Sequence, residues 1–157
     1  MTRMRWFALL LGWLIVAVVA MLLLGGHSIL VQPLLTSPYV PAGSLMTAIG
    51  FTAWAWAASI SIPASRKGPS SAEALVARLQ TIGIGLSLLW FPLGVGLSGN
   101  ASMTFQPGDG SQAGPSPSQL FWAMSAALAL LPLLLLGARL IIRHWSARRF
   151  DPLDGKS

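Results

Sequence analysis

The sequence predicts an all-α protein, an integral membrane four-transmembrane-helix bundle with both termini on the cytoplasmic side. Hydrophobic residues make up 54% of the 157 residues and charged residues only 9%, whereas soluble domains carry about 25% charged residues. Four apolar stretches of roughly 20 residues can each cross a bilayer as a helix. All ten Lys and Arg residues fall on one side of that arrangement, which predicts its orientation. We expect a single transmembrane domain over residues 1–157.

The first helix is predicted over residues 6–25. The segment from Phe7 to Leu24 contains no charged residue, and Arg3 and Arg5 precede it. A secretory signal peptide shares this basic start and apolar run, but it is usually shorter and ends at a cleavage site with small residues. No convincing site of that kind follows Leu24, so we expect an uncleaved membrane helix.

The second helix is predicted over residues 43–62, after an apolar loop that contains three prolines and neither Lys nor Arg. That loop is expected to lie at the membrane interface or to pack on protein. The helix should stop before Pro63, because the residue that precedes a proline avoids the helical conformation. Arg66 and Lys67 then form a short basic turn.

The third helix is predicted over residues 71–98. Ser70 and Glu73 have the spacing of a capping box, in which two side chains bond to backbone N–H groups at the helix start. Pro92 lies inside this helix and should kink it, because proline donates no backbone hydrogen bond. The carbonyl that it leaves free must find a partner on a neighbouring element.

The fourth helix is predicted over residues 117–145. Ser116 and Gln119 form a second capping box, with a proline at the first helical position, where proline is favoured. Pro132 lies inside the apolar run and should kink the helix. Basic residues follow that run, so the helix should project beyond the bilayer. Residues 150–157 are expected to form a flexible cytoplasmic tail.

Basic residues occupy the same side of the membrane at every segment. The two loops that should face outward, residues 25–43 and 99–118, contain neither Lys nor Arg. Because Lys and Arg are enriched in cytoplasmic loops, the basic side is predicted to be cytoplasmic. The arginine-rich, cysteine-free and loop-poor sequence favours a bacterial plasma (inner) membrane. The residues that set topology and can contact lipid headgroups are Arg3, Arg5, Arg66, Lys67, Arg139, Arg143, Arg148 and Arg149.

Small residues recur at four-residue spacing in the second and third helices. Such rows let helix backbones approach closely in lipid, where helix association depends on close packing. They indicate packing within this bundle, or else a face for another membrane subunit or a second copy of the chain. The residues concerned are Gly50, Ala53, Ala57, Ser61, Gly83, Ser87 and Gly94.

Trp54, Trp56 and Trp90 lie away from the ends of their predicted helices, although membrane tryptophans favour the headgroup region. Trp54 and Trp56 are two residues apart, so they point to nearly opposite sides of one helix. They can fill space beside the small residues, or they can stack on a flat ligand such as a quinone, a pigment or a lipid. They are the candidate cofactor-contacting residues, although no cofactor is predicted.

The sequence offers little for catalysis, and it predicts no catalytic residue and no metal site. No Asp, Glu, Lys or Arg lies in the middle of a predicted span, where ionisable residues mark proton or ion pathways. His27 and His144 should lie at opposite membrane faces, so they cannot share one metal or haem within a monomer. The chain has no cysteine. Basic residues stand at segment ends without interleaved aromatic residues, which argues against a nucleic-acid partner.

Three functions from different classes remain at this stage. The first is a non-catalytic accessory subunit or assembly factor of a larger membrane complex, indicated by the small-residue rows and the apolar outer loop. The second is a small oligomeric transporter or channel, indicated by the glycines and prolines of the third helix. The third is a membrane enzyme or a protein that binds a quinone, a pigment or a lipid. We expect the first, with the lipid bilayer and other membrane subunits or a second copy as partners.

Overall fold

A computed structural model of the chain describes residues 3–36, 39–62, 70–105 and 116–149. The chain is all-helical in its main elements, as predicted, and three of the described helices, α1, α3 and α4, are long and apolar enough to cross a membrane. A short 3-10 helix and a two-stranded hairpin join α1 to α2. The elements are α1 (Arg3–Leu24), the 3-10 helix (Ser28–Val31), β1 (Pro33–Thr36), β2 (Tyr39–Pro41), α2 (Ala42–Ser61), α3 (Ser71–Ser98) and α4 (Pro117–Arg149).

The helix bounds differ from the predicted ones mainly at the two ends of the chain. α3 begins and ends at the predicted residues, and α2 is displaced by one residue. α1 begins at Arg3, and α4 continues to Arg149, because the basic residues that flank the apolar runs extend the same helices. The predicted tail, residues 150–157, lies outside the described residues.

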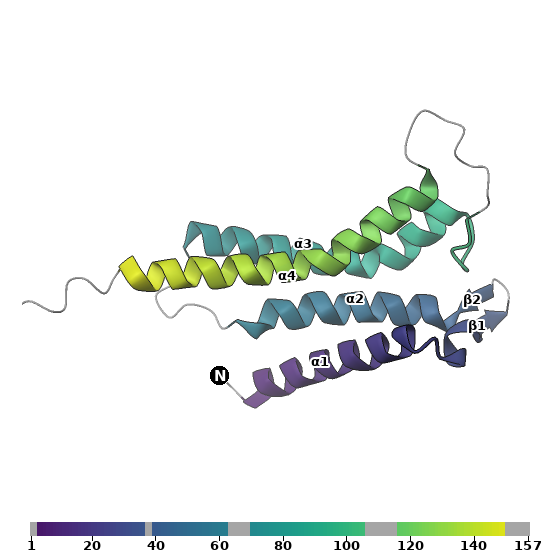
Figure 1. Cartoon of the computed structure of the whole chain (residues 1–157), viewed down its shortest axis with the longest axis horizontal. Helices are drawn as coiled ribbons and strands as arrows, with labels where there is room; N and C mark the ends of the chain where they lie inside the picture. Colours follow the sequence, from purple (N-terminus) through teal and green to yellow (C-terminus); the bar gives the residue numbers. More distant parts are fainter. Residues whose placement is uncertain (1–2, 37–38, 63–69, 106–115, 150–157) are drawn as a thin grey trace, which may run out of the picture.

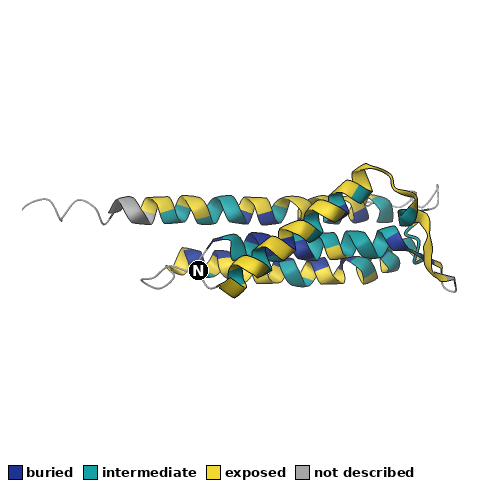
Figure 2. Ribbon diagram, turned by 90° about the horizontal axis from the view of Figure 1, so that it is seen from below, coloured by how far each residue is buried: buried dark blue, intermediate teal, exposed yellow. Residues whose placement is uncertain are grey.

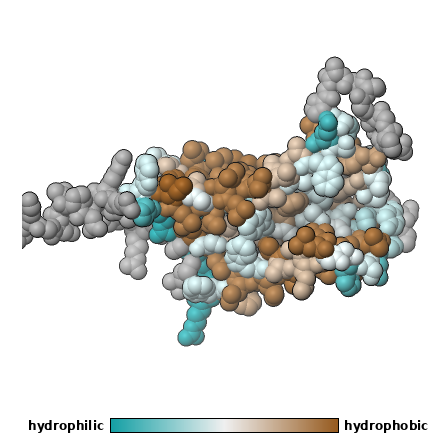
Figure 3. Space-filling model, viewed as in Figure 1, coloured by the Kyte–Doolittle hydropathy of each residue, from teal (hydrophilic) through white to brown (hydrophobic). Residues whose placement is uncertain are grey.

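The four helices run alternately in opposite directions (Figure 1). α2 lies in the middle and packs against α1, α3 and α4, and α3 packs along α4. The start of α1 and the end of α4 lie together at one end, here called the terminal end. β1 and β2 lie at the opposite end, here called the hairpin end. Figure 3 shows apolar side chains over most of one face, with hydrophilic side chains gathered towards the ends.

α2 is the most enclosed helix of the described chain. Ile49 is its one exposed residue, and Ala57 and Ala58 are fully buried. Figure 2 shows the contrast with the largely exposed surfaces of the other helices. Small side chains let three neighbours approach α2 closely. α2 is not among the three helices that stand out as apolar spans.

The contact between α3 and α4 follows a heptad spacing, with buried residues alternately three and four positions apart. This spacing keeps one seam of each helix against its partner and is typical of left-handed helix pairs that cross at about 20°. Many buried positions of α3 are small or polar, so packing in the seam is close. The buried residues are Glu73, Val76, Gln80, Gly83, Ser87, Trp90 and Gly94 on α3, and Phe121, Ser125, Leu128, Pro132 and Leu135 on α4.

Both predicted capping boxes are confirmed. The Glu73 N–H donates to the Ser70 hydroxyl at 3.2 Å, and the Ser70 N–H donates to the Glu73 carboxylate at 3.0 Å. The Gln119 N–H donates to the Ser116 hydroxyl at 3.3 Å, and the Ser116 N–H donates to the Gln119 side-chain oxygen at 3.0 Å. Each box satisfies backbone donors that have no partner inside the helix.

The segment predicted as an apolar loop is more ordered than expected. β1 and β2 pair antiparallel, with Leu35 opposite Val40. The Tyr39 hydroxyl donates to the Val31 carbonyl at 2.8 Å, and the Ala42 N–H donates to the Gln32 carbonyl at 2.9 Å. Backbone groups beside an apolar surface need partners, and the hairpin supplies them.

The two prolines inside helices do not interrupt them. α3 continues through Pro92, and α4 continues through Pro132. Figure 1 shows α4 changing direction near the middle of its length. Pro132 is buried and Pro92 is exposed, so α4 turns its proline towards the bundle and α3 turns its proline outward.

Candidate functional site

Two arginines from different helices meet the last turn of α2 at the terminal end. The Arg5 guanidinium donates from Nη2 and Nε to the Ile60 carbonyl, at 2.8 and 3.3 Å. The Arg139 Nη1 donates to the neighbouring Ser59 carbonyl at 3.1 Å. The last carbonyls of a helix have no partner within it and carry partial negative charge. The two guanidinium groups therefore cap α2 and tie α1 and α4 to its end.

Gln80 joins this cluster from α3. The Arg139 Nη1 also donates to the Gln80 side-chain oxygen, at 3.3 Å. Gln80 is only 5% exposed, and its Nε2 is a buried donor with no hydrogen-bond partner among the described residues. A buried donor without an acceptor costs about 1–3 kcal/mol. The cluster is therefore short of an acceptor.

Charge in this cluster is unbalanced. Arg139 interacts electrostatically with three charged neighbours, of which Glu73 is attractive, while Arg143 and Arg5 are repulsive. Glu73 is buried, and its carboxylate already accepts from the Ser70 N–H. Two of the three charged neighbours that act on Arg139 are thus repulsive. We call Arg5, Gln80, Arg139 and Arg143 the arginine cluster.

The predicted topology residues divide into four groups. Arg5, Arg139 and Arg143 belong to the arginine cluster, while Arg3 is exposed in the first turn of α1. Residues 148 and 149 end α4. Arg66 and Lys67 lie outside the described residues. Sequence analysis did not predict that Glu73 and Gln80 would join the arginines, although their seven-residue spacing places both on one face of α3.

Trp90 lies in the packed interior. It is 4% exposed, and its indole N–H donates to the Ser125 hydroxyl at 2.9 Å. The rings of Phe51 and Phe121 lie 5.6 and 5.5 Å from the Trp90 ring. Met103, Phe105 and Leu128 complete the cluster. Protein side chains surround the Trp90 ring, so Trp90 is a core residue in this structure.

Trp54 and Trp56 point to different sides of α2, as their spacing predicts. The Trp54 indole N–H donates to the Ala129 carbonyl of α4 at 2.9 Å, and its ring meets the edge of Trp13, with centroids 5.2 Å apart. Trp56 lines a groove on the opposite side of α2. Of the three candidate tryptophans, Trp56 lines the larger groove, which opens towards the surface.

The small residues of α2 bring it close to α1. A Cβ on Gly50 would lie 2.7 Å from Cγ1 of Val19, and a Cβ on Gly12 would lie 3.1 Å from the Ala57 Cβ. Both distances are shorter than the 3.5–4.0 Å that carbon atoms prefer. Ala53 and Ala57 are buried, and the Ser61 hydroxyl donates to the Ala57 carbonyl at 2.7 Å.

The small residues of α3 also face inward. A Cβ on Gly83 would lie 3.4 Å from a methyl group of Leu131, and a Cβ on Gly94 would lie 2.9 Å from the Met103 sulfur. Ser87 is fully buried and donates to the Gly83 carbonyl at 2.8 Å. Apart from Ser61, whose hydroxyl bonds within its own helix, the predicted small residues thus lie at contacts within the bundle or are buried in it.

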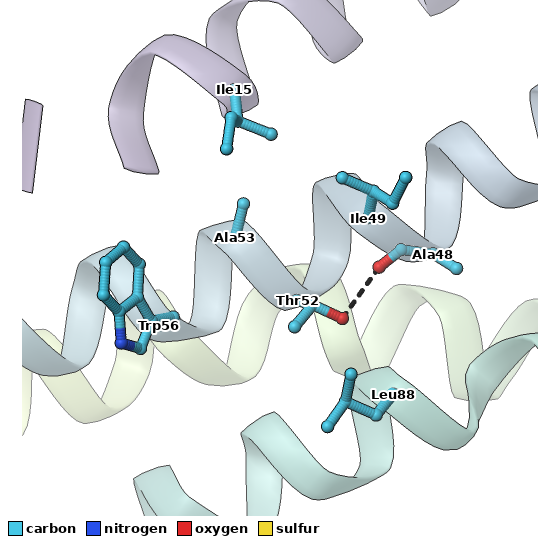
Figure 4. Close-up of a pocket in the computed structure, with 7 residues that line it drawn as sticks. All are labelled: Ile15, Ala48, Ile49, Thr52, Ala53, Trp56 and Leu88. Carbon is cyan, nitrogen blue, oxygen red and sulfur yellow. Dashed lines mark hydrogen bonds between the residues drawn. The ribbon is translucent and has the colours of Figure 1, made fainter. Parts of the chain in front are cut away.

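Two apolar grooves flank α2, one on each side of α1. The larger, of about 330 Å³, lies between α1 and α3 with α2 as its floor (Figure 4). The smaller, of about 180 Å³, is lined by α1, α2 and Ala129 of α4. Both exist because α1 packs chiefly on α2. The larger is lined by Ile15, Ala48, Ile49, Thr52, Ala53, Trp56 and Leu88.

The larger groove is lined almost entirely by apolar side chains. The Thr52 hydroxyl donates to the Ala48 carbonyl at 2.9 Å and is satisfied within the helix (Figure 4). Within the described residues, no three His, Asp or Glu side chains are placed to hold a metal ion. Comparison with known proteins finds no matching family model, no matching curated protein and no matching solved structure.

Proposed function

We propose that the chain crosses a bacterial inner membrane four times, with both termini in the cytoplasm. α1, α3 and α4 are long and apolar enough to cross. α2 has 20 residues, which at 1.5 Å per residue give about 30 Å, the thickness of a bilayer core. Its serines, threonines and glycines are compatible with a membrane position because three helices cover it.

The arrangement of the ends supports this topology. The start of α1 and the end of α4 lie at the same end of the bundle (Figure 1), which an even number of crossings requires. Arg5 and Arg139 meet α2 there. The segments that join α1 to α2 and α3 to α4, residues 25–43 and 99–118, contain no Lys or Arg. The positive-inside rule then assigns the terminal end to the cytoplasm.

Cysteine labelling tests this topology cleanly, because the chain has no cysteine of its own. In intact cells a membrane-impermeant maleimide should label Ser37→Cys and Ser111→Cys. Ser65→Cys and Ser157→Cys should be labelled only after the membrane is opened. Labelling of Ser65→Cys and Ser37→Cys from the same side would show that α2 does not cross.

We further propose that the protein is a non-catalytic accessory subunit or assembly factor of a larger membrane complex. The observation that carries this proposal is the position of α1. Its main helix contacts are with α2, and only Gly12 and Val19 of its 22 residues are buried. Large side chains project from its free faces; Leu10 is 63% exposed and Met21 is 72% exposed. This face can pack on a helix of another membrane protein.

Site-specific photo-crosslinking in native membranes tests the subunit proposal. Photo-reactive residues at Leu10, Leu14 and Met21 of α1 are compared with a control at Leu134 of α4, which is 68% exposed. We expect one protein adduct of the same mass at the α1 positions and none at Leu134, with that protein also co-purifying in a constant ratio. Equal adducts at all positions, or lipid adducts alone, would overturn the proposal. An adduct with the mass of two 16.6 kDa chains would show that the partner of α1 is a second copy of this chain and not a distinct subunit.

A further inference from the structure

The stripe of α2 that lines the larger groove continues along the helix to the arginine cluster. Ile49, Ala53 and Trp56 line the groove, and Ile60, whose carbonyl binds Arg5, is the next residue on the same stripe of α2. The spacing of four, three and four residues places all of them on one helix face. The distance from Ile49 to Ile60 along the helix is about 16 Å, close to half of a bilayer core of about 30 Å.

Arg5 and Arg139, which lie where this stripe of α2 ends, have N–H donors to spare. A guanidinium group carries five N–H donors. Arg5 uses Nε and Nη2, and Arg139 uses Nη1, in their bonds to α2 and Gln80. Both side chains are only partly buried. Planar guanidinium groups match phosphate oxygens in geometry as well as in charge.

The unpaired amide of Gln80 is an independent indication of a missing acceptor. Its Nε2 donor is buried and without a partner, on the same carboxamide whose oxygen binds Arg139. Arg139 is also repelled by Arg5 and Arg143, with Glu73 as the attractive neighbour. A bound anion would accept hydrogen bonds from Arg5 and Arg139 and would offset the repulsion that Arg5 and Arg143 exert on Arg139.

We propose that the chain binds one anionic phospholipid, with its phosphate at Arg5 and Arg139 and one acyl chain in the groove between α1 and α3. The positive charge of the two arginines favours a phosphate group, and the apolar lining of the groove favours an acyl chain. Basic pockets between transmembrane helices bind acidic headgroups in this manner. The proposal rests on the membrane placement of the chain and not on a partner subunit, so failure of the crosslinking experiment leaves it standing.

Native mass spectrometry of the full chain, released from bilayers of phosphatidylglycerol and phosphatidylcholine, tests the headgroup contact. We expect one retained phosphatidylglycerol per chain, in preference to phosphatidylcholine, with a preference that weakens at high salt. Arg5→Gln should reduce the preference about fivefold. Arg78→Gln is the matched control, because Arg78 is exposed on α3. Equal retention of the two lipids, or equal losses in both variants, would overturn the proposal.

A matched pair of threonines tests the groove. Thr52 lines the larger groove and Thr47 the smaller one, and each hydroxyl donates to the carbonyl four residues earlier. Thr52→Leu should fill the larger groove and lower lipid retention at least fivefold, whereas Thr47→Leu should leave it within twofold. Equal effects would overturn the acyl-chain site. Displacement of the lipid by excess glycerol phosphate would show a site for phosphate alone.

Tryptophan fluorescence in intact bilayers tests the lipid site in a protein whose arginines are unchanged. At low mole fraction, phosphatidylglycerol with brominated acyl chains should quench the protein more than brominated phosphatidylcholine does. Trp56→Phe should remove this additional quenching, because Trp56 lines the groove. Trp122→Phe should leave it unchanged, because Trp122 is exposed on α4. The proposal fails if the two lipids quench equally or if Trp56→Phe leaves the additional quenching unchanged.

Discussion

Gly50→Ala should separate α1 from α2. The new Cβ would lie 2.7 Å from Cγ1 of Val19 and 3.4 Å from its Cβ, while carbon atoms prefer 3.5–4.0 Å. Valine in a helix has one strongly preferred side-chain rotamer, so the backbones must move apart by about 1 Å. Overpacking of this kind costs about 1–3 kcal/mol, against which replacing an interior glycine contributes up to about 1 kcal/mol of helix propensity. With that offset in full, we expect a net loss of up to about 2 kcal/mol.

The assay is reversible unfolding in detergent, followed by circular dichroism. Gly85→Ala is the control, because no atom lies within 4 Å of a Cβ at that position, and it should be neutral or stabilising by up to about 1 kcal/mol. Val19→Ala removes the obstructing methyl groups, so the double variant should recover about 1 kcal/mol relative to the sum of the single changes. The reasoning is refuted if Gly50→Ala is as stable as Gly85→Ala, or if the two changes at Gly50 and Val19 are additive.

Three further predictions concern hydrogen bonds, and unfolding in detergent measures each of them. Ser125→Ala leaves the buried Trp90 indole N–H without its acceptor and should cost about 1–3 kcal/mol of stability. The double variant with Trp90→Phe should lose less stability than the two single variants together. Strict additivity would contradict the hydrogen bond. Ser70→Ala removes one half of the α3 capping box and should cost about 1 kcal/mol, with Ser71→Ala as the control. Arg139→Lys cannot reproduce the guanidinium contacts with Ser59 and Gln80 and should cost about 1–3 kcal/mol, whereas Arg78→Lys should be neutral.

Local interactions were the predictable part of this fold. The capping boxes at Ser70 and Ser116 involve residues three positions apart, so their geometry depends only on the start of one helix. Helix lengths follow from uninterrupted apolar runs in the same way. The hairpin of β1 and β2 was missed because Pro33 and Pro41, which indicate loops, stand at its edges, where strands tolerate proline.

Contacts between distant segments were not predictable from residue types alone. Arg139 meets Ser59 and Gln80 across 80 and 59 positions in the chain, and nothing in the local sequence pairs them. The small-residue rows indicated close helix contacts but not which helices make them. Gly50 proved to face Val19 of α1, and Gly94 proved to face Met103 beyond its own helix. Such pairings depend on helix rotation and chain direction, which single-sequence periodicity leaves open.

The packing of α2 against three neighbouring helices bears on the order in which the helices assemble during synthesis. During synthesis α1 emerges first, and its strongly apolar, charge-free run is stable in lipid without any protein contact. α2 emerges next, with its alanines, serines and threonines, when α1 is already in place to receive it. The α3–α4 pair then covers the remaining face. In the proposed four-crossing topology, the most enclosed helix, α2, thus enters the membrane beside a helix that already spans it, and the order of the segments along the chain is also an order of assembly.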